Sequence, residues 1–525
     1  MGTGKPHIPI AGPTTRDRLP YFILGGAFLG ALMLLNMGLG QEKPVLFTLL
    51  ALAAPTGAAL LFFDAFSLIV IGMAILPWAI FINVTDTLPV ISFYAFSVLA
   101  AVKLLARGKR LLLSPTLLMF TGFGVFLLAS SLLMGNIDET KSKLFHWFNF
   151  SLFFFVAYNL CDSLERARRL LTILIGSMLA NALFSIAMYY IANFAFPTPS
   201  QFVDSVLFKV GKIVYGGRGF DLILNGTNWF TEGGNLKALG LFHNPTQASL
   251  FALSAFGLSA FLLLDKRTLV SKVLLRANLA ASLAHLILCS GRSGMAAMPL
   301  LLLVWLYALV KVNGLRVSPR SILIAVLFGG LISIFLGNVL IMNFNSLFSL
   351  DYYSNAGRLV AMTSGLTVAS HAGAFGFGFG TTPTVMDMGQ ATTYVQQQIV
   401  ALIGSVSYSF KSILADEYYR QTNYHSLYVD LVVQTGYIGF TLFLAVFLKL
   451  GVMSRGGYSA LRYACFALIA AFVLSQAVGG DIFYPKVMIP LLLISALTER
   501  MNSKEFEKPE SHVGILESRK QSQRL

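Results

Sequence analysis

One run of the sequence, Tyr424-His425-Ser426-Leu427-Tyr428, brings together side chains that can carry protons and donate hydrogen bonds. It stands just before an apolar stretch long enough to cross a membrane. A histidine at the mouth of such a helix is suited to accept a proton, because its charge changes near neutral pH. The alternative is that the run only caps the helix at the membrane surface. The run makes His425 a candidate general base.

Two arginines have neighbours that suit an anionic ligand. Arg292 lies in the short turn Ser290–Gly294, where small residues would let a bulky group approach the backbone. Arg358 lies in a stretch that predicts an amphipathic helix on the membrane surface. The apolar face of this helix consists of Leu359, Met362 and Leu366. A guanidinium group is permanently charged and binds phosphate oxygens in pairs. For Arg292 the alternative is a side chain that only reaches toward the membrane surface.

Two further motifs have ordinary structural explanations. The run Leu241–Pro245 predicts the start of a helix, with Asn244 as its cap and Pro245 in the first turn. The run Phe375–Thr381 alternates Phe and Gly, but it follows a predicted helix and not a strand. It is therefore not a dinucleotide-binding motif, and a flexible turn is the alternative to a role in a site.

The amino-acid composition indicates what class of protein positions these residues. Of 525 residues, 56% are hydrophobic and only 12% are charged. A soluble protein could not bury so much apolar surface, and disordered and fibrous proteins are excluded too. The net charge of +15 follows from membrane topology, so we expect no nucleic-acid partner. Cys161, Cys289 and Cys465 share no short spacing, which argues against a disulfide framework or a metal site.

Hydropathy predicts an all-α polytopic membrane protein with about fourteen membrane helices. The expected spans are 21–40, 44–62, 65–83, 88–106, 113–134, 144–161, 170–192, 245–264, 272–289, 294–311, 321–343, 426–448, 460–478 and 482–498. The last span is the least regular, because it contains Lys486 and two prolines. With the N-terminus inside, most of the 38 Lys and Arg residues fall on the inner side, as the positive-inside rule requires.

The expected organisation alternates membrane helices with two long outer loops. From the N-terminus it consists of an inner tail (1–20), helices 1–7 (21–192), a first outer loop (193–243), helices 8–11 (244–343), a second outer loop with the amphipathic helix (344–424), helices 12–14 (425–498) and an inner tail (499–525). Long loops within a compact protein are usually functional or disordered, and the aromatic residues in both loops argue against disorder. We therefore expect the site on the outer face.

The spacing around His425 resembles the motif of the O-antigen ligase and polymerase superfamily. That motif is a histidine, then Asn, Ser or Gln, nine residues, Gly, two residues, and Gly, Thr or Tyr. Here it is matched by His425-Ser426, Gly436 and Gly439, and the family-like stretch covers about residues 240–450. These bacterial inner-membrane glycosyltransferases take glycans from polyprenyl diphosphate. The resemblance implies a GT-C-like fold, cytoplasmic termini and an active site on the periplasmic face.

The resemblance also implies roles for individual residues. His425 would be the catalytic base, and Arg292 and Arg358 would bind the diphosphate. Weaker expectations for glycan contacts are Tyr424, Tyr428, Arg218 and Arg420. The implied chemistry is inverting and uses no metal or other cofactor. The implied partners are an undecaprenyl-diphosphate-linked oligosaccharide, the lipid bilayer, and a chain-length regulator or flippase of the same pathway.

Three functions stay open at the level of sequence. A polymerase would transfer the growing glycan to a hydroxyl of another lipid-linked repeat unit, and the span count and long aromatic loop favour it. A ligase would transfer the glycan to lipid A-core or to protein. A flippase or secondary transporter is the third alternative. Transporters usually show broken helices in matching halves and charges at the midplane, whereas the candidate residues here gather at the outer face.

Overall fold

The computed structural model shows an all-helical protein. It describes residues 63–76, 91–106, 111–202, 235–240, 242, 244–265, 268–313, 353–389, 392–403, 424, 426–451, 459–477, 485–503 and 506. This part of the chain contains no strand. Five of its helical segments are long and apolar enough to cross a membrane: Pro115–Leu133, Leu164–Ala195, Pro245–Leu262, Arg292–Val312 and Leu427–Gly451. The predicted class, an all-α membrane protein, is thereby confirmed.

The helices follow the predicted spans closely wherever the chain is described. In chain order they are α3 (Ala65–Ile75), α4 (Ile91–Ala106), α5 (Pro115–Leu133), α6 (Ile137–Leu160), α7 (Leu164–Tyr190), the π-helix η3 (Ile191–Ala195), α8 (Pro199–Phe202), α10 (Pro245–Leu262), α11 (Lys272–Leu288), α12 (Arg292–Asn313), α14 (Tyr353–Ala369), the 3₁₀ turn η5 (Met386–Met388), α15 (Thr392–Ile403), α17 (Leu427–Gly451), α18 (Ser459–Ser475) and α19 (Pro485–Met501). The predicted spans 21–40, 44–62 and 321–343 lie outside the described residues. The total of fourteen stays a prediction.

Local sequence explains where several helices begin. Asn244 caps α10, since its side chain accepts a hydrogen bond from the Thr246 amide at 2.8 Å and Pro245 occupies the first turn. The helix start predicted there is confirmed. Ser114 caps α5 in the same way, by accepting from the Leu117 amide at 3.1 Å, and Pro115 follows it. A capping oxygen satisfies one of the amides that the first turn leaves unpaired.

Removing the cap of α10 should weaken the bundle measurably. We expect Asn244→Ala to lower the free energy of unfolding by about 1 kcal/mol, because the Thr246 amide loses its acceptor. Thermal unfolding of the purified protein in detergent measures this change. Asn244→Asp keeps a capping oxygen and should retain the wild-type midpoint. Equal losses in the two variants would mean that the cap is not what Asn244 contributes.

The helical bundle is built around α10 and α19. α10 packs against α7, α11, α12, α18 and α19, and 89% of the residues in its 18-residue apolar stretch are buried. α19 is buried along nearly its whole length and packs against α6, α10 and α18, so its lysine and prolines do not interrupt it. α12 lies at the periphery, because only 17% of the residues in its most apolar 18-residue stretch are buried. Its exposed apolar side chains are those expected to meet lipid.

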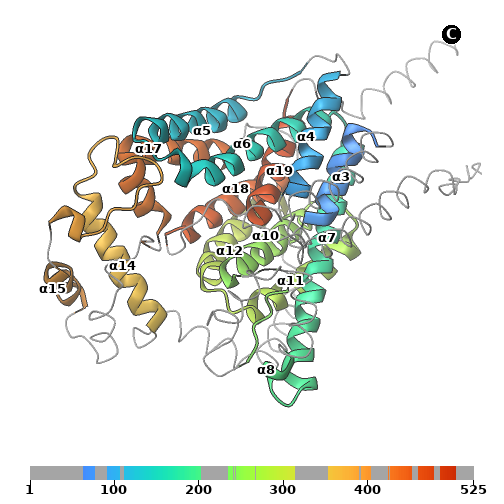
Figure 1. The fold of residues 1–525 in the computed structure, drawn as a ribbon. Coiled ribbons are helices and arrows are strands. Elements are labelled where there is room, and N and C mark those ends of the chain that lie inside the picture. Colours follow the sequence, from blue (N-terminus) through green and yellow to red (C-terminus); the bar gives the residue numbers. More distant parts are fainter. Residues whose placement is uncertain are drawn as a thin grey trace, which may run out of the picture.

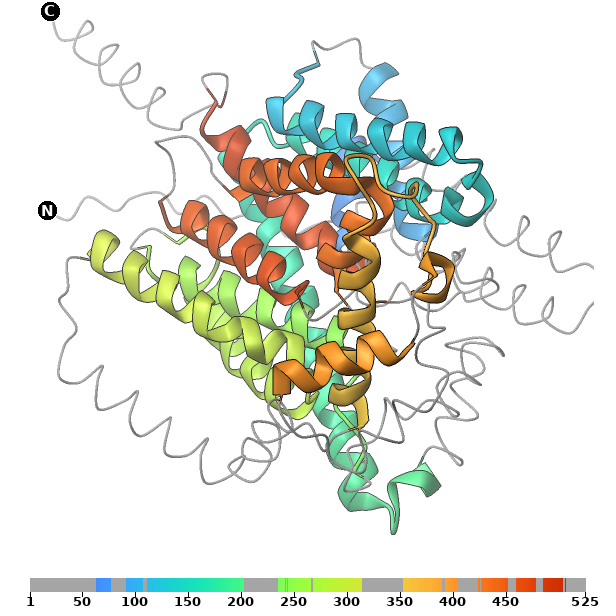
Figure 2. The same cartoon turned by 90° about the vertical axis from the view of Figure 1, so that its left-hand side faces the viewer.

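A second, smaller layer lies beyond one end of the bundle. In Figure 1, α14 and α15 stand at the left, on the side opposite α3, and Figure 2 shows them in front of the remaining helices. α14 packs against α15 and against α17, which also packs along α5 and α18 within the bundle. α17 therefore connects the outer layer, which carries Arg358, to the membrane helices.

Candidate active site

The outer layer has an apolar core of its own. Buried Val360 and Val368 of α14 pack with Val395 of α15 and with Val429 and Val433 of α17. The helix predicted around Arg358 is present. Of its predicted apolar face, Leu359 and Met362 pack against this core, whereas Leu366 is 54% exposed. α14 is thus held by protein contacts along the side that carries Leu359 and Met362.

The two candidate arginines approach each other across the boundary between the layers. Arg292 is the first residue of α12, and Arg358 lies in the second turn of α14. Both side chains are half-buried. Burial and the positive charge of Arg292 both lower the pKa of Arg358. Arg358 forms no hydrogen bond or ion pair with the described part of the chain. Two repelling guanidinium groups form a strong site for an anion.

The small residues around Arg292 serve helix packing. A Cβ atom on Gly291 would lie 2.4 Å from the carbonyl oxygen of Pro245, and one on Gly294 would lie 2.7 Å from Ser249 Cβ. The Gly294 amide donates to Ser249 Oγ at 3.2 Å. The start of α10 therefore fills the Cβ side of both glycines, and the approach of a ligand to this backbone stays a prediction. The glycines fix the start of α12, and with it Arg292.

Two lysines that sequence reasoning did not assign to the site lie beside this turn. The segment around Lys237 pairs with the end of α11, since the Ala238 amide donates to the Leu288 carbonyl at 3.1 Å. The charge of Lys237 is close enough to act on Cys289. Lys486 starts α19 and is 7% exposed, with its Nζ 4.7 Å from the centre of the Phe242 ring. Phe242 precedes the cap of α10. Lys237 therefore adds positive charge beside the start of α12, whereas Lys486 is buried against an aromatic ring.

Gly436 breaks α17 and receives the glycine-rich run. Its backbone angles, φ 66° and ψ −172°, are open to glycine alone. A Cβ atom there would lie 2.2 Å from the Ala374 carbonyl oxygen. On either side of the break, the Phe377 amide donates to the Val433 carbonyl at 2.8 Å and the Ile438 amide donates to the Ala374 carbonyl at 3.1 Å. The first glycine of the family-like motif thus docks the loop that follows α14.

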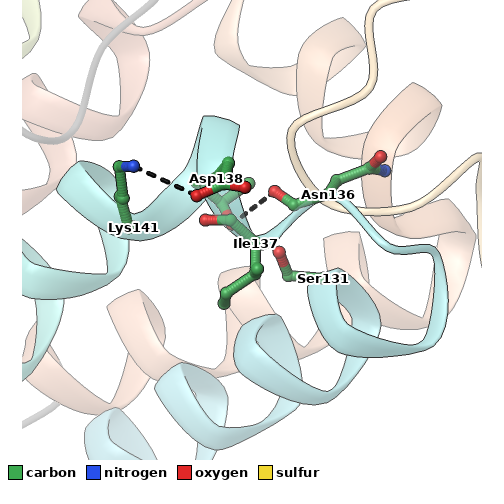
Figure 3. Close-up of polar contacts among 6 residues, drawn as sticks. Ser131, Asn136, Ile137, Asp138 and Lys141 are labelled. Atoms are coloured by element: carbon green, nitrogen blue, oxygen red, sulfur yellow. Dashed lines mark hydrogen bonds and ion pairs between the residues drawn. The ribbon is translucent and has the colours of Figure 1, made fainter.

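The same loop is anchored beside the turn between α5 and α6, on the last turn of α5 and on α17. The Phe379 amide donates to Ser130 Oγ at 3.1 Å, and the Gly380 amide donates to Gln434 Oε1 at 3.1 Å. Figure 3 shows this turn, where Lys141 forms an ion pair with Asp138 at 3.1 Å and Ser131 lies beside Asn136. The run from Phe375 to Gly380 is therefore a packed connection between α14, α17 and α5, and not a flexible turn.

Substituting Gly436 tests whether this docking holds the outer layer in place. We expect Gly436→Ala to lower the free energy of unfolding by about 2–4 kcal/mol, because the backbone becomes strained and the new Cβ overlaps Ala374. Thermal unfolding in detergent measures the loss. Gly122→Ala is the matched control, since no atom lies within 4 Å of the added Cβ. A midpoint for Gly436→Ala equal to that of the control would contradict the docking.

The two tyrosines of the candidate motif are tied to backbone carbonyls. Tyr424 is 2% exposed, packs against Gly365 of α14, and donates its hydroxyl to the Pro383 carbonyl. Burial and the nearby carboxylates of Asp430 and Asp387 raise the pKa of Tyr424, so its hydroxyl remains a donor. Tyr428 donates to the Val473 carbonyl of α18. These contacts position the start of α17, and they leave Tyr424 little surface for a glycan.

The remaining predicted site residues cannot be placed. His425, Arg218 and Arg420 lie outside the described residues. Tyr424 and Ser426, which flank the histidine in sequence, are both described and buried. Gly365, which Tyr424 contacts, is seven residues beyond Arg358 and so lies on the same face of α14, two turns away. Tyr424 therefore packs about two turns along α14 from Arg358.

The described residues offer anion-binding groups rather than a set of metal ligands. No group of three His, Cys, Asp or Glu side chains gathers within that part of the chain. The three cysteines are buried free thiols at separate places. Comparison with models of known protein families gives no match, and a search of curated proteins gives none either.

Proposed function

We propose that this protein is a membrane glycosyltransferase that polymerises glycans carried on undecaprenyl diphosphate. The observation that supports this best is that Arg292 and Arg358, which come from separate helices, lie near enough for the charge of one to act on the other. Like charges held together are unfavourable unless an anion joins them. A diphosphate has the charge and the several oxygens that two guanidinium groups bind.

The start of α12 favours the same ligand. Arg292 is its first helical residue, so the positive end of the helix dipole lies beside the guanidinium group. Lys237 adds positive charge nearby. In the proposed reaction these cations stabilise the negative charge that develops on the departing diphosphate, which is the largest electrostatic demand of the transfer.

His425 supplies the remaining step. The histidine takes the proton of an acceptor hydroxyl, and the freed oxygen bonds to the anomeric carbon of the donor glycan. The bond between that carbon and the diphosphate oxygen breaks, and undecaprenyl diphosphate leaves with the electron pair. A single displacement of this kind inverts the anomeric centre. Tyr424, the residue before His425 in sequence, packs against α14, which carries Arg358.

A glycolipid gel of the native host tests this function. Deleting the gene should remove long polysaccharide while a single repeat unit still reaches its final acceptor. If the single repeat also stays on its lipid carrier, the protein is a ligase. Unchanged glycolipids in the deletion strain would contradict both activities. Unchanged glycan length with lipid-linked repeats trapped on the inner leaflet would indicate a flippase.

A further inference from the structure

A groove of about 480 Å³ opens between α12 and α18, far along α12 from the candidate active site. It is lined by Leu303, Val304, Tyr307, Gly451, Arg462, Tyr463 and Phe466. Leu303 is 64% exposed and Phe466 is 41% exposed. Because α12 is the least buried of the long apolar helices described, this face is the one that meets lipid.

Two tyrosines and two cationic side chains lie together at the mouth of the groove. The Lys311 Nζ lies 5.8 Å from the centre of the Tyr307 ring, and the Arg462 guanidinium lies 5.2 Å from the centre of the Tyr463 ring. The two tyrosine rings meet edge to face, with centroids 6.0 Å apart. The mouth is therefore a row of four side chains with a positive charge at each end, and the aromatic rings hold the cations in place.

The two cations are available to an anion. Within the described part of the chain, neither Lys311 nor Arg462 pairs with a carboxylate. Lys311 follows Arg292 by nineteen residues along α12, which spans about 28 Å of helix. This is about the thickness of the hydrocarbon core, so the mouth of the groove lies at the opposite membrane face from Arg292.

We propose that this groove binds an anionic glycerophospholipid. One acyl chain lies along Leu303, Val304 and Phe466, and the phosphate binds Arg462 at one end of the row. Lys311 at the other end adds to the positive potential of the mouth. The tyrosine hydroxyls lie at the depth of the headgroup, where aromatic residues of membrane proteins concentrate. A zwitterionic lipid fits the apolar groove equally well but carries no net charge to match the cations. The proposal does not depend on the glycosyltransferase reaction.

Native mass spectrometry of the full chain tests the proposal. The protein is released from a mild detergent after incubation with equal amounts of phosphatidylglycerol and phosphatidylcholine. We expect wild type to retain phosphatidylglycerol about 10-fold more than phosphatidylcholine. Lys311→Gln with Arg462→Gln should abolish this preference. The matched control, Lys272→Gln with Arg276→Gln, removes two exposed cations from α11 and should preserve it. Thermal unfolding checks that both double variants are folded.

Two kinds of result would overturn the proposal. One is equal retention of the two lipids by wild type, or an unchanged preference in the Lys311 and Arg462 double variant. The other comes from a photo-crosslinking amino acid at position 303. If it links to a peptide from residues 321–343 and not to lipid, the groove is filled by the chain itself. Leu303→Trp fills the groove but keeps both cations, and it should reduce retention of both lipids.

Discussion

Arg358→Gln is expected to lower turnover of a lipid-linked donor by about 10²–10³-fold, because one of two groups that stabilise the departing diphosphate is lost. Initial rates with purified protein measure the effect. Arg358→Lys keeps the charge but loses the paired hydrogen bonds, so its turnover should lie between those of Arg358→Gln and wild type. Arg276→Gln is the control, since this exposed cation lies on α11 away from the site.

The same variant should not be destabilised. The pKa of Arg358 is lowered in the folded protein, which means that folding disfavours its charged form. The charged Arg358 side chain therefore lowers the free energy of unfolding at every pH below the pKa of Arg358 in the folded protein, which includes neutral pH. A neutral glutamine side chain at this position removes that cost, so Arg358→Gln should unfold at the wild-type temperature or above it. A lower midpoint together with lost activity would mean that the arginine has a structural role instead.

His425→Ala is expected to lower turnover by about 10²–10⁴-fold while the donor still binds. The histidine is assigned to proton removal from the acceptor, and the diphosphate contacts are assigned to arginines. The two kinds of variant should therefore differ. Arg358→Gln should weaken binding of the lipid-linked donor, measured by retention on the purified protein, and His425→Ala should leave that retention unchanged.

His371→Ala is the matched control for the histidine variant. His371 is exposed just beyond the end of α14, and its Nδ1 is 3.0 Å from the Thr367 carbonyl oxygen. Its removal should leave turnover at the wild-type level. If the two histidine variants lose activity equally, or if His425→Ala keeps full turnover, His425 is not the base.

The sequence was sufficient to predict the class of the fold and many of its helices. Long apolar stretches are a local property, so the positions of α5, α7 and α10 could be predicted directly. The cap at Asn244 could be predicted for the same reason. The irregular last span was also a helix, although Lys486 argued against it, because the interior of the bundle accommodates the lysine against Phe242.

Contacts between distant segments could not be predicted. Arg292 and Arg358 were both singled out from their neighbours, but only the packing of the layers brings their charges together. The sequence predicts one continuous span around Gly436, but the helix is broken there. The backbone of Gly436 is fixed by the loop that packs against it. Lys237 carries no local signal at all. Its place beside the candidate site depends on the pairing of Ala238 with α11.

The most direct test supplies purified protein with a defined repeat unit on undecaprenyl diphosphate. We expect wild type to release one undecaprenyl diphosphate for each new glycosidic bond, and we expect Arg358→Gln and His425→Ala both to lose this release. Glycan elongation and carrier release are followed in the same reaction. If wild type forms no glycosidic bond, or if carrier release is unchanged in both variants, the assignment of these residues to diphosphate-linked glycan transfer is wrong.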